Sequence, residues 1–106
     1  MKLGIIIYSN DAETVWNAFR LANTGLTAGD EVRVFLLGKG VECESLSNDK
    51  FKILDAMQEF VSKQGALLAC GTCLKLRNQQ STEMCPLSTM KDLRTLIVEC
   101  EKVLTF

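Results

Sequence analysis

Residues 3–8 form a nearly continuous apolar run, rich in β-branched side chains, and a polar stretch follows it directly. Such a run is typical of a strand that is buried on both faces of a parallel sheet. Asn10 is placed to cap a following helix, and Glu13, three residues later, completes a capping box. The helix ends at Gly29 and presents one apolar stripe, which consists of Val15, Phe19, Ala22 and Leu26. The chain is therefore predicted to open with a buried strand and a helix that covers it.

The same alternation of strand and helix continues along the chain. Further strands are predicted over residues 31–37, 66–70 and 103–106, with a short edge strand between 80 and 87 that has Pro86 at its end. A helix over residues 49–63 is expected to bury Leu54, Met57 and Val61, and a brief helix is expected over 74–79. The last helix is predicted to start at Ser88 or Thr89 and to bury Leu93, Leu96, Ile97 and Cys100.

This order of elements defines an α/β fold. Strands that alternate with helices predict a mostly parallel five-stranded sheet in a three-layer α/β/α arrangement, flavodoxin-like in type. A length of 106 residues corresponds to one domain, residues 1–106. Because so small a domain buries only part of its apolar surface, association between copies of the chain is expected.

Composition excludes several classes of protein. With 12 basic and 13 acidic side chains, the formal net charge is −1, which argues against a nucleic-acid-binding protein. The longest unbroken apolar run, residues 66–70, is far shorter than the roughly 20 residues that cross a bilayer. No membrane partner and no signal peptide are therefore expected, and the predicted location is the cytoplasm.

Because the sequence contains no histidine, its cysteines are considered next as functional residues. Without histidine there is no Ser-His or Cys-His nucleophile pair and no His-ligated metal, and no arrangement of Ser, Asp or Glu indicates a hydrolase. Five cysteines remain: Cys43, Cys70, Cys73, Cys85 and Cys100. An odd number without a signal peptide indicates free thiols in a reducing compartment. The cysteines are the candidate functional residues.

Cys70 is the best candidate because it closes a predicted buried strand. Ligands of open parallel sheets collect at the carboxyl ends of the strands. Gly71 permits close approach by a partner, and the helix that follows is expected to lower the pKa of Cys70 and favour its reactive thiolate. Lys75 and Arg77 would add to this effect if their side chains reach back. The alternative is that Cys70 is a small apolar filler at a strand end.

The other cysteines carry weaker signals. Cys73 completes a C-x-x-C pair with Cys70 and could resolve a mixed disulfide or a persulfide, or be a helix-start residue without chemistry. Cys43 and Cys85 are expected to be surface or filler residues, and Cys100 a core residue. A four-thiolate metal or iron–sulfur site is disfavoured because only one C-x-x-C is present, so no metal and no cofactor is predicted. Residues 38–40 (GKG) match no phosphate-binding motif and predict a plain turn.

Four segments together resemble the DsrE/DsrF-like family, most closely its short stand-alone prokaryotic members. They are MKLGIIIYS (1–9), ACGTC (69–73), STMKDL (88–93) and KVLTF (102–106). The resemblance spans the chain and implies the three-layer DsrEFH-like fold and assembly into a trimer or hexamer. In the sulfur-relay members, of DsrE and TusD types, a cysteine at the position of Cys70 carries sulfur as a persulfide between partner proteins.

Three hypotheses about function follow. The first is an intracellular sulfur carrier, sulfurtransferase-like, that accepts sulfane sulfur on Cys70 from a donor protein and passes it to an acceptor protein. The second is a dithiol redox protein that uses Cys70 and Cys73. The third is a non-catalytic oligomeric module that binds a small ligand at the same edge of the sheet.

Overall fold

A computed structural model describes all 106 residues. Five strands form one sheet in the order β4-β3-β2-β1-β5, and every neighbouring pair is parallel. The strands are β1 (Lys2–Ile7), β2 (Glu31–Leu36), β3 (Ala66–Cys70), β4 (Leu87–Ser88) and β5 (Lys102–Thr105). The α-helices are α1 (Ala12–Thr27), α2 (Ile53–Ser62), α3 (Gly71–Leu76) and α4 (Met90–Glu99), and η1 (Gly38–Leu46) is a 3-10 helix. The predicted α/β fold with a five-stranded parallel sheet is confirmed.

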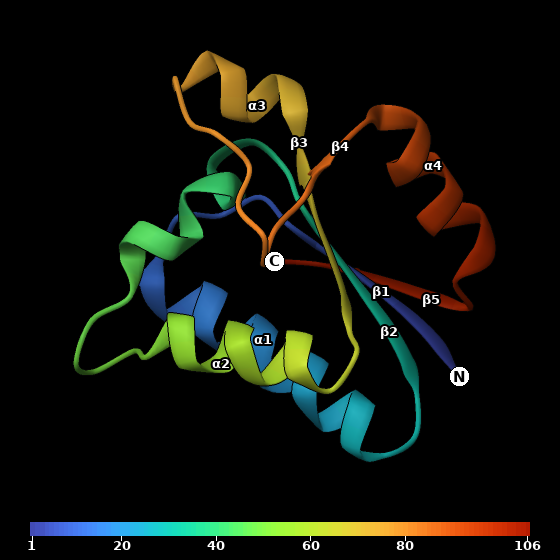
Figure 1. Cartoon of the computed structure of the whole chain (residues 1–106). Coiled ribbons are helices and arrows are strands. Elements are labelled where there is room, and N and C mark those ends of the chain that lie inside the picture. Colours follow the sequence, from blue (N-terminus) through green and yellow to red (C-terminus); the bar gives the residue numbers. More distant parts are fainter.

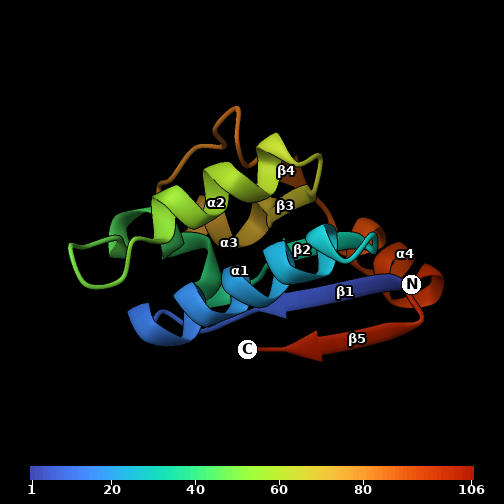
Figure 2. The same cartoon turned by 90° about the horizontal axis from the view of Figure 1, so that it is seen from below.

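The helices lie on both faces of the sheet. Helices α1 and α2 pack side by side on one face, and α4 lies across the other, while α3 stands beyond the carboxyl end of β3 (Figure 1). Seen from below, β5 runs beside β1 at the outer edge of the sheet (Figure 2). At Gly4 in β1, a Cβ atom would lie 2.5 Å from Leu96 Cδ2 of α4. The lack of a side chain there lets α4 approach the sheet closely.

Burial explains why the central strands are so apolar. Strand β1 is buried at five of its six positions, and β2 at four of six. The largest fully buried side chains include Phe19 of α1, Phe35 of β2 and Phe60 of α2. These residues fill the layers on either side of β1 and β2, as expected for a parallel sheet that is covered by helices. None of the helices combines the length and apolar character that crossing a membrane requires.

Several predicted details were wrong. Asp11, not Asn10, caps α1, because the chain is still extended at Asp11 and its carboxylate accepts the Thr14 backbone N–H at 3.0 Å. Residues 38–46, expected to be a turn and a polar loop, form η1. Strand β4 follows Pro86 instead of ending at it, since Pro86 contributes its carbonyl to the Ala69 N–H at 3.1 Å.

The predicted inner faces of two helices also differ from the structure. Helix α2 buries Ile53, Met57 and Phe60, whereas Leu54 is exposed. Because Ile53 and Phe60 are seven residues apart with Met57 between them, they form a regular stripe shifted by one position from the predicted one. In α4, Leu93 and Leu96 are buried as expected, but Ile97 is 49% exposed.

Candidate functional site

Cys70 ends β3 and caps α3, so it lies at the carboxyl edge of the sheet. Strand β3 has the bounds predicted from the sequence, and it is paired with β2 on one side and with β4 on the other. Cys70 faces Ser88 in the pairing with β4. Its side chain is only 2% exposed. The pairing with β2 ends at Ala69, so β4 is the strand that pairs with Cys70 itself at the start of α3.

The two cysteines of the C-x-x-C pair are brought together by the first turn of α3. The Cys73 backbone N–H donates to Cys70 Sγ at 3.4 Å, so the Cys70 sulfur acts as the side-chain cap of the helix. The Gly38 backbone N–H donates to Cys73 Sγ at 3.2 Å. Each sulfur therefore accepts one backbone hydrogen bond, and the β2–η1 junction is joined to the start of α3 through the Cys73 sulfur.

The expected lowering of the Cys70 pKa was wrong. Burial is the main cause that raises the pKa of Cys70 above its ordinary value, and the adjacent Cys73 side chain raises it further. The backbone N–H groups of Cys73 and Thr72 lower the pKa of Cys70, but by less. Removing the thiolate from water thus outweighs the stabilisation that the helix start provides. The resting thiol is protonated at neutral pH.

The two basic residues after the pair do not act as predicted. Arg77 Nε forms an ion pair with Glu42 of η1 at 2.7 Å, and Arg77 also donates to the Cys73 carbonyl at 3.1 Å. Arg77 therefore ties α3 to η1 and holds the helix that carries the thiols. Lys75 is exposed and has no ion pair.

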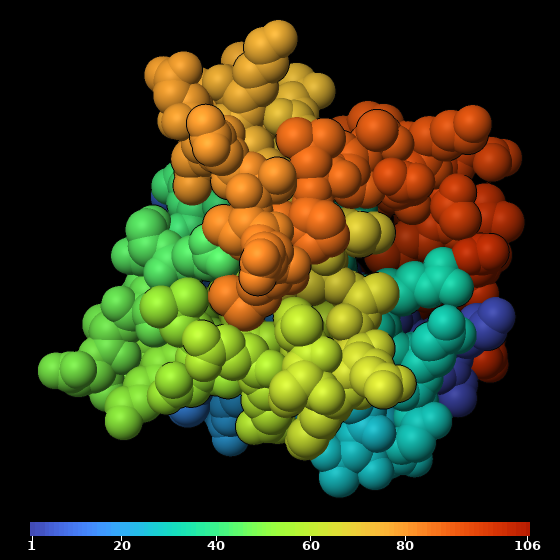
Figure 3. All heavy atoms as spheres, in the orientation of Figure 1, coloured from blue at the N-terminus to red at the C-terminus, as the bar shows by residue number.

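A pocket of about 830 Å³ opens between α3 and the start of α4, with Cys70 in its wall. In the space-filling view, these two helices project separately from the molecule and leave a hollow between them (Figure 3). Leu74, Leu87 and Met90 supply apolar surface. The other lining residues are Gly71, Thr72, Lys75, Asn78, Gln79, Gln80, Ser88 and Thr89. Cys70 is the only cysteine that lines this pocket.

Two of the remaining cysteines, Cys43 and Cys85, are packed inside the molecule, and Cys100 is partly buried. Cys43 and Cys85 are buried and line one small cavity, and Cys43 Sγ lies 3.7 Å from Met57 Sδ. Burial raises the pKa of both thiols, that of Cys85 to about 12. Cys85 lies before β4, outside the edge strand, which was predicted between residues 80 and 87. Cys100 is half-buried and packs over Gly4, in agreement with a core role.

These placements do not bring the thiols into one metal site. Cys70 and Cys73 form one pair, Cys43 and Cys85 another, and no group of three or more cysteine or acidic side chains is arranged to hold a metal ion. All five cysteines are free thiols in this structure.

Some residues of the site had no clear signal in the sequence. Gly38, whose N–H reaches Cys73, and Glu42, which pairs with Arg77, both lie 35 residues away from their partners. Gly38 has a φ of +55°, which glycine adopts readily. A glycine directly after a strand end is the one sequence signal for this position. Ser88 lines the pocket, and its hydroxyl donates to the Asp92 carboxylate at 2.6 Å. The sequence marked Ser88 only as a possible first residue of the last helix.

Comparison with known proteins identifies the family. The model of the DsrE/DsrF-like family matches residues 1–106, and the chain belongs to this family. It is 30% identical over its whole length to the whole of the uncharacterized protein MJ0989 of Methanocaldococcus jannaschii. Over 89% of its length, it is 29% identical to the uncharacterized protein MK0008 of Methanopyrus kandleri, of which 83% is covered. The resemblance seen in the four sequence segments is thereby confirmed.

Two solved structures share the fold. The ychN protein from E. coli superposes with a TM-score of 0.84 at 20% identity, and the match covers all of both chains. The conserved protein of unknown function BT1422 from Bacteroides thetaiotaomicron gives a TM-score of 0.79 at 19% identity, over 99% of this chain and 94% of that one. At these identities the likeness concerns the fold alone.

Proposed function

We propose that this member of the DsrE/DsrF-like family is a sulfur carrier that accepts sulfane sulfur on Cys70 as a persulfide and passes it to an acceptor. One observation carries the proposal: Cys70, at the carboxyl end of a central strand, is the only cysteine in the wall of the pocket between α3 and α4. Strand ends of this kind are where ligands of open parallel sheets bind. The family assignment supports the same conclusion.

The arrangement suits a group that must be loaded and unloaded. In loading, the Cys70 thiol first gives up its proton to water; its thiolate then attacks the outer sulfur of a donor R–S–SH, the S–S bond of the donor breaks, and R–S⁻ leaves and takes up a proton. In unloading, an acceptor thiolate attacks the outer sulfur of the Cys70 persulfide and the Cys70 thiolate leaves. The Cys73 N–H, 3.4 Å from Cys70 Sγ, is placed to stabilise the negative charge on that sulfur in both steps.

The test is sulfur loading followed by mass spectrometry of peptides under non-reducing conditions. Incubation with polysulfide should add about 32 Da, one sulfur atom, to the Cys70 peptide, and a reductant should remove it. The Cys70→Ser variant should lose this adduct. Cys100→Ser is the matched control, because Cys100 lies outside the pocket, and it should load like the original chain. Loading that survives Cys70→Ser would refute the proposal.

A dithiol redox function is the second candidate, and the geometry of Cys73 favours it. Cys73 lies on the first turn of α3, one turn after Cys70, and its sulfur is held by the Gly38 N–H at 3.2 Å. The same mass spectra distinguish this function: a loss of about 2 Da that links Cys70 to Cys73 indicates an intramolecular disulfide. If mild oxidants give this product while polysulfide gives no adduct, the redox function replaces the carrier.

Assembly into a homo-trimer or homo-hexamer in the cytoplasm, with a separate sulfur donor and an acceptor protein, is part of the proposal. Large apolar side chains outside the pocket lining are exposed on α4: Ile97 is 49% exposed and Val98 64%. Surface of this kind commonly marks a contact between proteins. Light scattering coupled to size-exclusion chromatography should give three or six times the chain mass of 11.8 kDa.

A further inference from the structure

The pocket beside Cys70 carries only positive charge. Of the twelve residues that line it, Lys75 is the only charged one, and none is acidic. The nearest acidic group along α4, Asp92, does not line the pocket and accepts the Ser88 hydroxyl at 2.6 Å. A ligand of the pocket therefore meets a cation and no opposing carboxylate.

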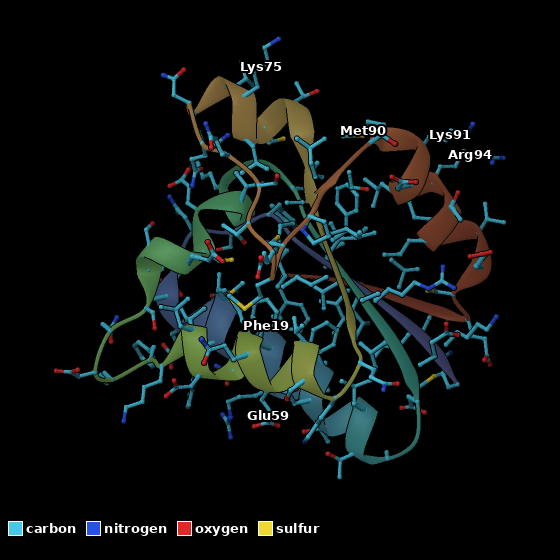
Figure 4. All side chains as sticks on the ribbon, viewed as in Figure 1. Phe19, Glu59, Lys75, Met90, Lys91 and Arg94 are labelled. Atoms are coloured by element: carbon cyan, nitrogen blue, oxygen red, sulfur yellow. The ribbon has the colours of Figure 1, made fainter.

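The uncharged part of the lining is suited to a peptide-like molecule. Three side-chain amides, those of Asn78, Gln79 and Gln80, can each donate and accept hydrogen bonds. Thr72, Ser88 and Thr89 also line the pocket, and since the hydroxyls of Ser88 and Thr89 are bonded to Asp92, the Thr72 hydroxyl is the one left for a ligand. Figure 4 shows Lys75 on α3 and Met90 at the start of α4, the two helices that flank the pocket.

The size of the pocket and the burial of Cys70 limit what can reach the sulfur. A volume of about 830 Å³ falls within the roughly 300–1,000 Å³ of sites that hold small organic ligands. It is far larger than a hydrosulfide ion requires. Cys70 is a residue of only 2% exposure, so its sulfur can be reached only by a group that projects into the pocket. A slender ligand that fills the pocket and presents its sulfur at the inner end fits both facts.

We propose that the pocket binds an anionic, low-molecular-mass organic persulfide of peptide-like character as the sulfur donor, with its carboxylate near Lys75 and its outer sulfur at Cys70. This inference rests on the proposed carrier function. The Cys70 thiolate attacks the outer sulfur of R–S–SH, a new S–S bond forms, and the anionic thiolate R–S⁻ leaves through the opening. No external oxidant or reductant is needed, because the sulfane sulfur only moves from one thiol to another.

Binding can be measured without the sulfur transfer. S-methylglutathione, which cannot react with Cys70, has the peptide amides and the carboxylates of the proposed ligand and should bind the reduced chain saturably in titration calorimetry. Lys75→Gln removes the charge and should weaken binding about two- to fivefold, as expected for one exposed ion pair. Lys102→Gln is the matched control: Lys102 is also exposed, but it lies in β5 at the opposite edge of the sheet. It should leave the affinity unchanged.

Neutralising the ligand provides a second comparison. The diethyl ester of S-methylglutathione lacks both carboxylates, so it should bind the original chain more weakly and should not respond to Lys75→Gln. An absence of saturable binding, or equal losses for Lys75→Gln and Lys102→Gln, would overturn the inference. So would transfer that occurs only from a persulfidated protein and not from glutathione persulfide.

The failure of this inference differs from the failure of the carrier function. If polysulfide loads Cys70 but S-methylglutathione does not bind, the pocket assignment is wrong and the carrier function stands. If S-methylglutathione binds and no donor loads Cys70, the carrier function is wrong and the pocket is a binding site only. The donor assignment is then wrong as well.

Discussion

At the scale of single residues, the reactivity of Cys70 is set by burial and by one neighbouring sulfur. Because both raise the pKa of Cys70, its thiolate fraction at neutral pH is small. We expect the rate of Cys70 alkylation by iodoacetamide to rise with pH and to reach its midpoint above that of the urea-unfolded chain. Peptide mass spectrometry of pH-dependent labelling measures this rate. A midpoint at or below that of the unfolded chain would contradict the expectation.

The contribution of Cys73 can be separated with one variant. In the original chain the Cys73 side chain raises the pKa of Cys70, and the Cys73 backbone N–H lowers it. Cys73→Ala removes the side-chain sulfur and keeps the backbone N–H. The midpoint of Cys70 alkylation should therefore move to lower pH in Cys73→Ala. Cys100→Ala serves as the control and should leave the midpoint in place. An unchanged midpoint in Cys73→Ala would show that the Cys73 sulfur does not act on Cys70, and a shift to higher pH would show that it lowers the pKa of Cys70.

The sequence predicted that Cys70 lies at the end of a strand, but it did not predict how burial shifts the pKa of the thiol. A strand that ends in Cys-Gly ahead of a helix places the thiol at the edge of a parallel sheet, and the structure agrees. The direction of the pKa shift was predicted wrongly, because burial depends on β4, whose two residues pair with the end of β3. So short an edge strand has no periodicity that a sequence could reveal. The Gly38–Cys73 contact joins residues 35 apart and is equally invisible.

At the scale of elements, α4 depends on its capping box. The Thr89 hydroxyl accepts the Asp92 N–H at 3.2 Å, and the Asp92 carboxylate accepts the Thr89 N–H at 3.3 Å. Thr89→Ala removes the first of these bonds and should lower the free energy of unfolding by about 1 kcal/mol. Thr95→Ala, in the middle of the same helix, is the control and should be close to neutral because alanine favours helix interiors. Urea titration with an unchanged m-value gives both numbers.

Equal effects of the two threonine variants would show that the cap contributes nothing.

The cap was predicted from the sequence as Ser88 or Thr89, and local patterns of this kind are recognised because all their atoms lie within one turn. The buried faces of α2 and α4 were predicted less well. Leu54 and Ile97 are apolar and fit a helical stripe, yet both are exposed. Which of two adjacent stripes faces the sheet depends on how the helix is rotated against β1–β3, and this information is not local.

At the scale of the whole molecule, two thiols in the interior make folding sensitive to high pH. Burial raises the pKa of Cys43, and it raises the pKa of Cys85 to about 12, whereas in the unfolded chain both thiols have the ordinary pKa of about 8.5. Between these values the unfolded chain has lost protons that the folded chain keeps. The unfolded state then binds fewer protons, so the free energy of unfolding falls as pH rises. Below about pH 8.5 the two thiols keep their protons in both states, so they do not lower the free energy of unfolding there.

The contribution of these two thiols can be isolated by comparing the original chain with the double variant Cys43→Ala, Cys85→Ala. The variant loses packing in the small cavity by the same amount at every pH, so its stability is lower throughout. Its stability should nevertheless decline less steeply above pH 8.5, because two of the thiols that drive the decline are absent, while Cys70, Cys100 and all lysines are common to both proteins. Urea titrations at intervals of pH from 7 to 10.5 measure both curves. Parallel curves would show that the buried thiols ionise no differently in the folded and unfolded chains, and the interior around Cys43 and Cys85 would then have to be open to water.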